Sequence, residues 1–172
     1  RTKEQLTGVF ANKLMADSVA MLNLLNNDQF VSSYGFTADN ILAMFLPNTY
    51  EFFWNTHAEK VFERMNKEYH KFWTEKRIQE VAAIPLTPIE VSILASIVEE
   101  ETNKVSEYPI VAGLYINRLR KGMLLQADPT VKYAVGDFAL RRVLNVHLKT
   151  DSPYNTYLYT GLPPGPIRIP SA

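Results

Sequence analysis

The distribution of hydrophobic and polar residues predicts a chain that is helical over most of its length. Apolar residues recur about every 3.6 positions across residues 1–46, with a polar break at 26–28, and predict several short helices. Residues 58–83 repeat this pattern with charges on the opposite face, which predicts one long amphipathic helix. Residues 45–54, between these regions, are rich in aromatic side chains and interrupted by proline. They favour a strand or a loop packed against a groove.

Two further helices are indicated by their termini. Residues 87–90 (Thr-Pro-Ile-Glu) combine an N-cap hydroxyl, a proline at the first helical position and the acid of a capping box. A helix should therefore begin here and continue to about residue 103. A second helix is expected at about 110–121, because a basic last turn is followed by Gly122. Residues 123–172 contain short strand-like runs between proline- and tyrosine-rich loops. The predicted fold class is α+β, helix-rich with short strands in the C-terminal third.

Three consecutive acids close the helix that begins near residue 88. On a helical wheel turning about 100° per residue, Glu101 falls in the middle of the apolar face, whereas Glu99 and Glu100 lie off its centre. A carboxylate in that position is costly to bury unless it is paired or used in chemistry. Desolvation also raises the pKa of a carboxyl group, which turns it into a proton donor near neutral pH. The alternative is that the helix frays at Glu99 and all three acids are solvated.

The C-terminal third is rich in polar and aromatic side chains. Residues 126–130 (Gln-Ala-Asp-Pro-Thr) predict a loop with an Asx-type turn before a strand. Residues 152–157 and 159–165 combine tyrosines, amides and hydroxyls with stiff proline turns. Tyrosine rings can cover the C–H face of a sugar while amides bond its hydroxyl or acetamido groups, so these loops suit a sugar groove. The alternative is a tightly turned surface loop whose tyrosines pack on the core.

Composition narrows the possible chemistry. The chain has 18 basic and 18 acidic residues, and this zero net charge argues against a nucleic-acid partner. Because cysteine is absent, disulfides and thiolate nucleophiles are excluded. The three histidines have no metal-ligand spacing, and no phosphate-binding or dinucleotide-binding glycine motif is present, so neither a metal nor a cofactor is expected. Among the classes of chemistry considered, acid–base catalysis by a carboxyl group on a neutral polar polymer is the one that composition leaves open.

Several ordered blocks of this sequence resemble the endolytic murein transglycosylases of the MltG/YceG-like family. The first block is 95–102 (Ala-Ser-Ile-Val-Glu-Glu-Glu-Thr). The others follow at 116–119, 125–131, 152–157 and 160–167. Upstream, residues 45–50 resemble the family's Pro-Asp-Thr-Tyr segment, with Asn48 where aspartate is typical. Residues 141–149 match the family pattern poorly and are assigned no role.

The resemblance implies an enzyme that cuts the β-1,4 bond between N-acetylmuramic acid and N-acetylglucosamine within glycan strands. Such an enzyme leaves 1,6-anhydro ends and would limit the length of nascent strands. The family's catalytic glutamate precedes a threonine or serine, which corresponds to Glu101 before Thr102. One carboxyl can suffice because the substrate's own C6 hydroxyl is the nucleophile. Glu101 would protonate the leaving oxygen and then deprotonate that hydroxyl.

Other residues are candidates for binding or for secondary roles. The expected substrate-binding residues are Gln126, Asn155, Tyr157, Thr102 and Tyr154. Possible secondary residues are Glu99, as the fallback acid, Asp128 and Asn117; Asn117 and its neighbour Arg118 could instead orient the loops. Two alternative functions remain open. One is a muramidase-type hydrolase that uses Glu101 with Asp128 and water, and the other is a non-catalytic glycan-binding module.

The expected organisation has two parts. Residues 1–45 would be a helical N-terminal part of the catalytic region, and residues 46–172 the transglycosylase core. A first residue other than methionine and a proline-rich end predict a trimmed piece of a longer protein. The resemblance implies a LysM-like module and an inner-membrane anchor upstream of Arg1, with the catalytic domain on the periplasmic side. The implied partners are glycan strands and the peptidoglycan synthases that make them.

Overall fold

The computed structural model describes residues 2–15 and 17–171, and every regular element in this part of the chain is a helix. The α-helices are α1 (Lys3–Ala11), α2 (Ser18–Leu25), α3 (Asp28–Ser32), α4 (Ala58–Phe72), α5 (Glu75–Ala82), α6 (Pro88–Glu101), α7 (Tyr108–Arg120) and α8 (Asp128–Val135). The short 3-10 helices are η1 (Ile41–Met44), η2 (Val105–Glu107) and η3 (His147–Lys149). The predicted α+β class is therefore wrong, since the described residues contain no strand.

The missing strands have a local cause. Where a loop before a strand was expected, Asp128 and Pro129 begin helix α8, since proline suits the first turn of a helix. The helix ends at Gly136, whose left-handed backbone (φ 76°) is the conformation that glycine adopts most easily. After η3 the backbone bonds are mainly turns between close neighbours, such as that from the Asn155 N–H to the Ser152 carbonyl. These residues therefore form turns instead of pairing as strands.

The helices expected in the first two thirds are largely confirmed. Helix α6 begins with the capping box between Thr87 and Glu90, and helix α7 occupies the region expected for the second helix. The long helix predicted over 58–83 is instead two helices, α4 and α5. The break follows Trp73, because the hydroxyl of Thr74 accepts from the Arg77 N–H and caps α5.

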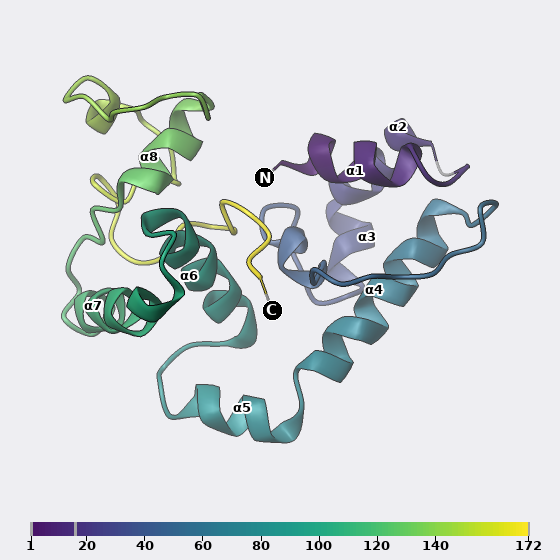
Figure 1. The fold of residues 1–172 in the computed structure, drawn as a ribbon, viewed down its shortest axis with the longest axis horizontal. Coiled ribbons are helices and arrows are strands. Elements are labelled where there is room, and N and C mark those ends of the chain that lie inside the picture. The colour runs from purple at the N-terminus through teal and green to yellow at the C-terminus, as the bar shows by residue number, and fades with distance from the viewer. Residues whose placement is uncertain (1, 16, 172) are drawn as a thin grey trace.

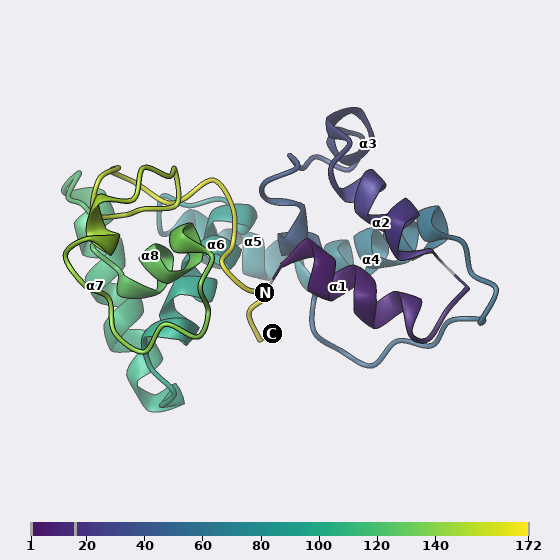
Figure 2. The same ribbon diagram turned by 90° about the horizontal axis from the view of Figure 1, so that it is seen from above.

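Two hydrophobic clusters divide the molecule into two lobes (Figures 1 and 2). One is built from α2, α3, η1 and α4 and includes the fully buried ring of Phe62. The other is built from α6, α7 and the residues before α8, and includes Ile167. The C-terminal tail, defined as residues 167–171, runs between the lobes, and Ile169 packs against the first cluster (Figure 1). The division at residue 45 stays a prediction.

The extended segment 45–52 lies along a groove. This pocket has a volume of about 970 Å³ and is lined by α1, this segment and tail residues such as Arg168. The expectation that residues 45–54 form a strand or a loop against a groove is therefore confirmed in its loop form. None of the helices in the described part of the chain combines the length and apolarity that a bilayer span requires.

Candidate active site

The three consecutive acids at the end of α6 occupy three different environments. Glu99 is buried, with 9% of its surface exposed, Glu100 is half-buried and Glu101 is exposed. The helix continues through Glu101 and does not fray at Glu99. The expectation that Glu101 is buried on an apolar face is therefore wrong. Helix α6 is buried nearly all round, and the tail covers the side that carries Glu99, so a helical wheel cannot identify the covered acid.

A tyrosine from the neighbouring helix holds one oxygen of Glu101. The Tyr115 hydroxyl, on α7, donates to the Glu101 Oε2 at 3.0 Å. The other oxygen, Oε1, has no hydrogen-bond partner among the residues that the structure describes. Burial, followed by the nearby charge of Glu101, raises the pKa of Tyr115 far above its ordinary value, so the hydroxyl remains a donor. Glu101 is thus oriented on one side and open on the other.

Tyr115 was not among the residues selected from the sequence. It lies on the inward face of α7, and only 4% of its surface is exposed. A buried tyrosine needs a partner for its hydroxyl, whereas phenylalanine would fill the same space without one. A tyrosine on a predicted buried helix face therefore indicates a polar partner nearby, but the sequence does not show that this partner is Glu101.

A second acid and a second tyrosine lie near Glu101. The Tyr157 hydroxyl donates to the Asp128 Oδ1 at 2.6 Å. Burial, the bond to Asp128 and then the charges of Asp128 and Glu101 raise the pKa of Tyr157 to about 12. The carboxylates of Asp128 and Glu101 therefore both raise the pKa of the Tyr157 hydroxyl. The structure brings together three residues selected from the sequence: Glu101, Asp128 and Tyr157.

Gln126 is placed beside this cluster by an unusual backbone. It is the one non-glycine residue in the described part of the chain with a positive φ, at 54°. Its N–H donates to the Thr156 carbonyl at 3.0 Å, and the Arg118 guanidinium donates to the Leu125 carbonyl at 2.7 Å and to the Gln126 Oε1 at 3.3 Å. Backbone conformations of this kind persist where surrounding contacts enforce them, often at functional sites. Arg118 therefore orients the loop, as one of the two sequence hypotheses held.

Asn155 cannot contact a glycan as expected, because it is fully buried. Its Nδ2 donates to the carbonyls of Leu148 (3.0 Å) and Thr150 (2.8 Å), and its Oδ1 accepts from the Tyr157 N–H at 3.0 Å. Asparagine often bonds to nearby backbone in turns, and here it fixes the loop that carries Tyr157.

The remaining candidates make contacts within the chain. Tyr154 is half-buried, with its ring centroid 4.7 Å from that of Tyr133. The hydroxyl of Thr102 donates to the Glu107 Oε2 at 2.6 Å. Asn117 is exposed on α7. These positions shape the surroundings of Glu101, whereas Gln126, Asp128 and Tyr157 present exposed or partly exposed polar groups beside it.

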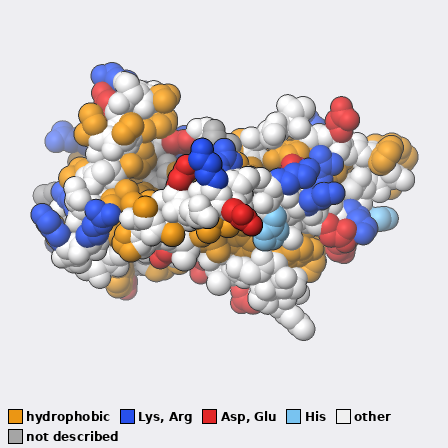
Figure 3. Space-filling model, turned by 90° about the horizontal axis from the view of Figure 1, so that it is seen from below, with side chains coloured by type: hydrophobic (Ala, Val, Ile, Leu, Met, Phe, Trp, Pro, Cys, Tyr) orange, Lys and Arg blue, Asp and Glu red, His pale blue; other side chains and the backbone are white. Residues whose placement is uncertain are grey.

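The charges around the site do not suggest a metal centre. No group of three or more histidine and acidic side chains among residues 2–15 and 17–171 is arranged to hold a metal ion. On the face shown in Figure 3, acidic and basic side chains are interspersed with hydrophobic ones and form no single basic patch. The chemistry available at this cluster is that of two carboxyl groups, two phenols and an amide.

Comparison with known proteins identifies the family. The family model described as YceG-like matches residues 1–172. The chain belongs to the YceG-like family. This result confirms the resemblance inferred from residues 95–167, and the YceG-like assignment now covers the N-terminal lobe as well.

Two curated relatives of this YceG-like chain are named endolytic murein transglycosylase. The protein of Bacillus subtilis (strain 168) is 39% identical over 113 residues, which are 66% of this chain and 31% of the relative. That of Streptococcus pneumoniae serotype 2 is 38% identical over 90 residues, or 50% of this chain and 16% of the relative. The crystal structure of a YceG-like protein from Listeria monocytogenes superposes on the whole chain with a TM-score of 0.80 at 29% identity, covering 61% of that structure. The chain thus spans less than a third of the curated relatives it matches.

The hydrogen bond from Tyr115 can be removed without changing the shape of the core. In the Tyr115→Phe variant, kcat for a reaction that uses the Glu101 carboxyl, such as the murein transglycosylation for which the relatives are named, should fall about tenfold, because a hydrogen bond to a charged group is lost while packing is kept. KM should change by less than about twofold, since the hydroxyl faces the Glu101 carboxylate. Steady-state rates on purified strands would test this, and an unchanged kcat in the folded variant would contradict the orienting role of Tyr115.

Proposed function

We propose that this domain is a catalytic core that cleaves peptidoglycan glycan strands internally, as an endolytic lytic transglycosylase. The bond cut would be the β-1,4 bond between N-acetylmuramic acid and N-acetylglucosamine, and the product would carry a 1,6-anhydro end. The observation that carries the proposal is the state of Glu101, an exposed carboxylate with one oxygen held and the other open. The names of the two curated relatives support the choice of substrate.

The proposed chemistry uses Glu101 twice. Its carboxyl group first donates a proton to the glycosidic oxygen, so that the bond to the muramic acid C1 breaks and the N-acetylglucosamine hydroxyl leaves. The resulting carboxylate then removes the proton from the C6 hydroxyl of the same muramic acid, whose oxygen bonds to C1. The donor from Tyr115 fixes Oε2, which leaves Oε1 for these transfers. Gln126 and Tyr157 would position the sugar.

The environments of the other two acids support Glu101 over its neighbours. Glu99 accepts from the backbone and hydroxyl of Ser171 and lies 3.5 Å from the Arg168 guanidinium. Glu100 is paired with the same guanidinium at 3.0 Å. Both of these carboxylates are thus engaged within the chain, whereas Glu101 keeps one oxygen open to a substrate. This argument makes the fallback acid, Glu99, a structural group.

A hydrolase that uses Asp128 as a second carboxyl is the alternative with an observation in its favour. Asp128 is exposed and acts on Tyr157 together with Glu101. In such a hydrolase, Asp128 would serve as nucleophile or would activate water. The names of the two curated relatives favour the transglycosylase over this hydrolase.

The chemical ends of the products distinguish a lytic transglycosylase from a hydrolase and from a glycan-binding module. Purified glycan strands incubated with the domain should give fragments that end in 1,6-anhydro-muramic acid, detected by mass spectrometry as products about one water lighter than hydrolysis products. Reducing ends would support the hydrolase and overturn the lyase. Binding without any cleavage by the folded protein would favour a glycan-binding module.

The proposal also includes a location. Enzymes that act on murein work in the cell envelope, so we place this domain there, on the periplasmic side of the inner membrane. A membrane anchor elsewhere in the protein and contact with peptidoglycan synthases belong to the same proposal, and the names of the relatives support only its coarser part, the substrate. Fractionation of cells that produce the natural full-length protein would test the location.

A further inference from the structure

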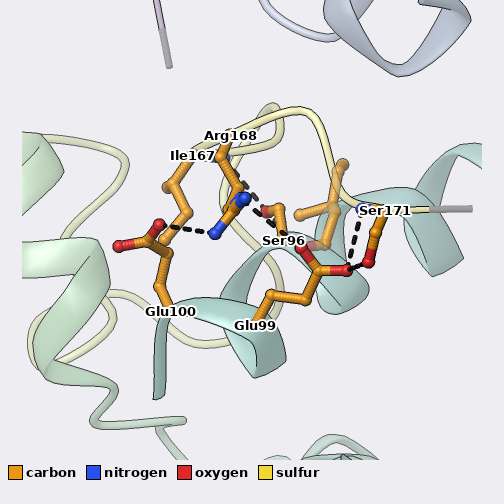
Figure 4. A network of polar contacts seen from close by, with 7 residues as sticks. Ser96, Glu99, Glu100, Ile167, Arg168 and Ser171 are labelled. Carbon is orange, nitrogen blue, oxygen red and sulfur yellow. Dashed lines mark hydrogen bonds and ion pairs between the residues drawn. The ribbon is translucent and has the colours of Figure 1, made fainter. Parts of the chain in front are cut away.

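The tail is fastened to helix α6 by polar contacts (Figure 4). The Ile167 N–H donates to the buried hydroxyl of Ser96 at 3.1 Å. The Ser171 N–H donates to the Glu99 Oε1 at 2.8 Å, and the Ser171 hydroxyl donates to the same oxygen. Residues about 70 positions apart in sequence are therefore joined along the last two turns of α6.

Arg168 joins two adjacent acids of α6 (Figure 4). Its Nη1 lies 3.0 Å from the Glu100 Oε1, and its Nε lies 3.5 Å from the Glu99 Oε2. The two carboxylate side chains are only 8% and 15% exposed, whereas that of Arg168 is 36% exposed. Burying two neighbouring carboxylates without a counter-charge would be unfavourable, so the guanidinium neutralises both at once.

The C-terminal turn of α6 needs this counter-charge for a second reason. The C-terminal end of a helix carries a partial negative charge, so acids are unfavourable there and basic residues are favourable. Helix α6 ends with three glutamates and has no basic residue in its last turn. Its final backbone bond, from the Thr102 N–H to the Val98 carbonyl, is long at 3.4 Å. A positive charge that α6 itself lacks is supplied by Arg168 from the tail.

We propose that Arg168 is a positioning residue for the reaction: by bridging Glu99 and Glu100, it keeps the last turn of α6 helical and so holds Glu101 against Tyr115. This inference rests on the proposed function, in which Glu101 is the acid and base. The guanidinium of Arg168 pairs with Glu99 and Glu100 and not with Glu101. Its effect passes through the backbone of the turn that the three acids share.

The test compares substitutions of two arginines that each form an ion pair with a glutamate. Arg168→Gln should lower kcat on glycan strands about tenfold with KM within about twofold, because orientation is lost while sugar contacts remain. Arg168→Lys should recover part of kcat, since it restores one positive charge but not the planar guanidinium that reaches both carboxylates. Arg64→Gln, which removes the 2.9 Å pair with Glu68 on α4, should leave both constants unchanged.

Amide hydrogen exchange reports on the stability of the last turn of α6 independently of activity. In Arg168→Gln, the Thr102 amide should exchange its hydrogen about tenfold faster, measured by NMR, whereas amides in the middle of α7 keep their wild-type rates. If a charge left on Glu99 prevents this variant from folding, the double variant Glu99→Gln/Arg168→Gln removes that charge. It still lacks the bridge to Glu100, and its kcat should fall by the same factor.

Two outcomes would overturn the inference in distinguishable ways. A folded Arg168→Gln variant with wild-type kcat and wild-type Thr102 exchange, beside an active wild type, would overturn the role of Arg168 and leave the proposed function intact. A folded wild type that cleaves no strand would overturn the proposed function and this inference together.

Discussion

Replacement of Glu101 by glutamine should reduce glycan cleavage about 1,000-fold while the protein remains folded, because general acid–base catalysis contributes on the order of 10²–10⁴ in rate. Glutamine has nearly the same shape as glutamate, and its amide oxygen can still accept from Tyr115. Its amide cannot donate a proton to the glycosidic oxygen or remove one from the C6 hydroxyl. Since Glu101 is exposed, the unfolding midpoint should hardly change. The measurement is the initial rate of anhydro-end formation by mass spectrometry, with circular dichroism to confirm folding.

Asp128→Asn is the matched variant, because it removes the other exposed carboxylate of the cluster. The asparagine can still accept from the Tyr157 hydroxyl, so cleavage should fall less than about tenfold. A loss as large as that of Glu101→Gln would contradict the single-acid mechanism and favour the hydrolase. A folded Glu99→Gln variant that loses more activity than Glu101→Gln would contradict the assignment of the acid.

Replacement of Asn155 by alanine should lower the free energy of unfolding by about 3 kcal/mol. The substitution removes three part-buried hydrogen bonds, to the carbonyls of Leu148 and Thr150 and from the Tyr157 N–H, each of which contributes about 1 kcal/mol. Urea denaturation followed by circular dichroism measures the change. A sugar-binding role, by contrast, would raise KM and leave stability nearly unchanged.

Asn145→Ala provides the control for this prediction. Asn145 lies in the same part of the chain but is exposed, so its removal should change the free energy of unfolding by less than about 0.5 kcal/mol. An Asn155→Ala variant that is as stable as Asn145→Ala but binds glycan strands more weakly would restore the interpretation of Asn155 as a ligand contact.

Sequence patterns predicted the helices where one side chain determines a terminus. Thr87 and Glu90 satisfy each other's backbone groups, so the start of α6 depends only on residues close in sequence. Thr74 is a cap of the same kind, although the hydrophobic pattern across it predicts one uninterrupted helix. At α8 the signal is Pro129 in the first turn, where residues 126–130 also fit a turn motif. The errors at α5 and α8 therefore arose from competing local signals.

The candidate site depends on contacts that no local pattern contains. The burial of Glu99 is produced by Arg168 and Ser171, about 70 positions later in the chain, and a helical wheel includes neither residue. Likewise, the bond between Asp128 and Tyr157 spans 29 positions. Glu101 was selected from its position on the wheel and from the family motif, although the environment expected for it was wrong. Only the folded arrangement shows that its carboxylate is open on one side.

The spacing of two isoleucines in the tail links the two lobes to the acids of α6. Ile167 is buried in one hydrophobic cluster and Ile169 packs against the other, so a single residue separates the two anchors. Residue 168 and the contact of Ile89, on α6, with the first cluster therefore both lie where the two lobes meet. Arg168 carries the guanidinium that pairs with Glu99 and Glu100. The segment that joins the two hydrophobic cores is thus fastened to the same helical turn that presents Glu101.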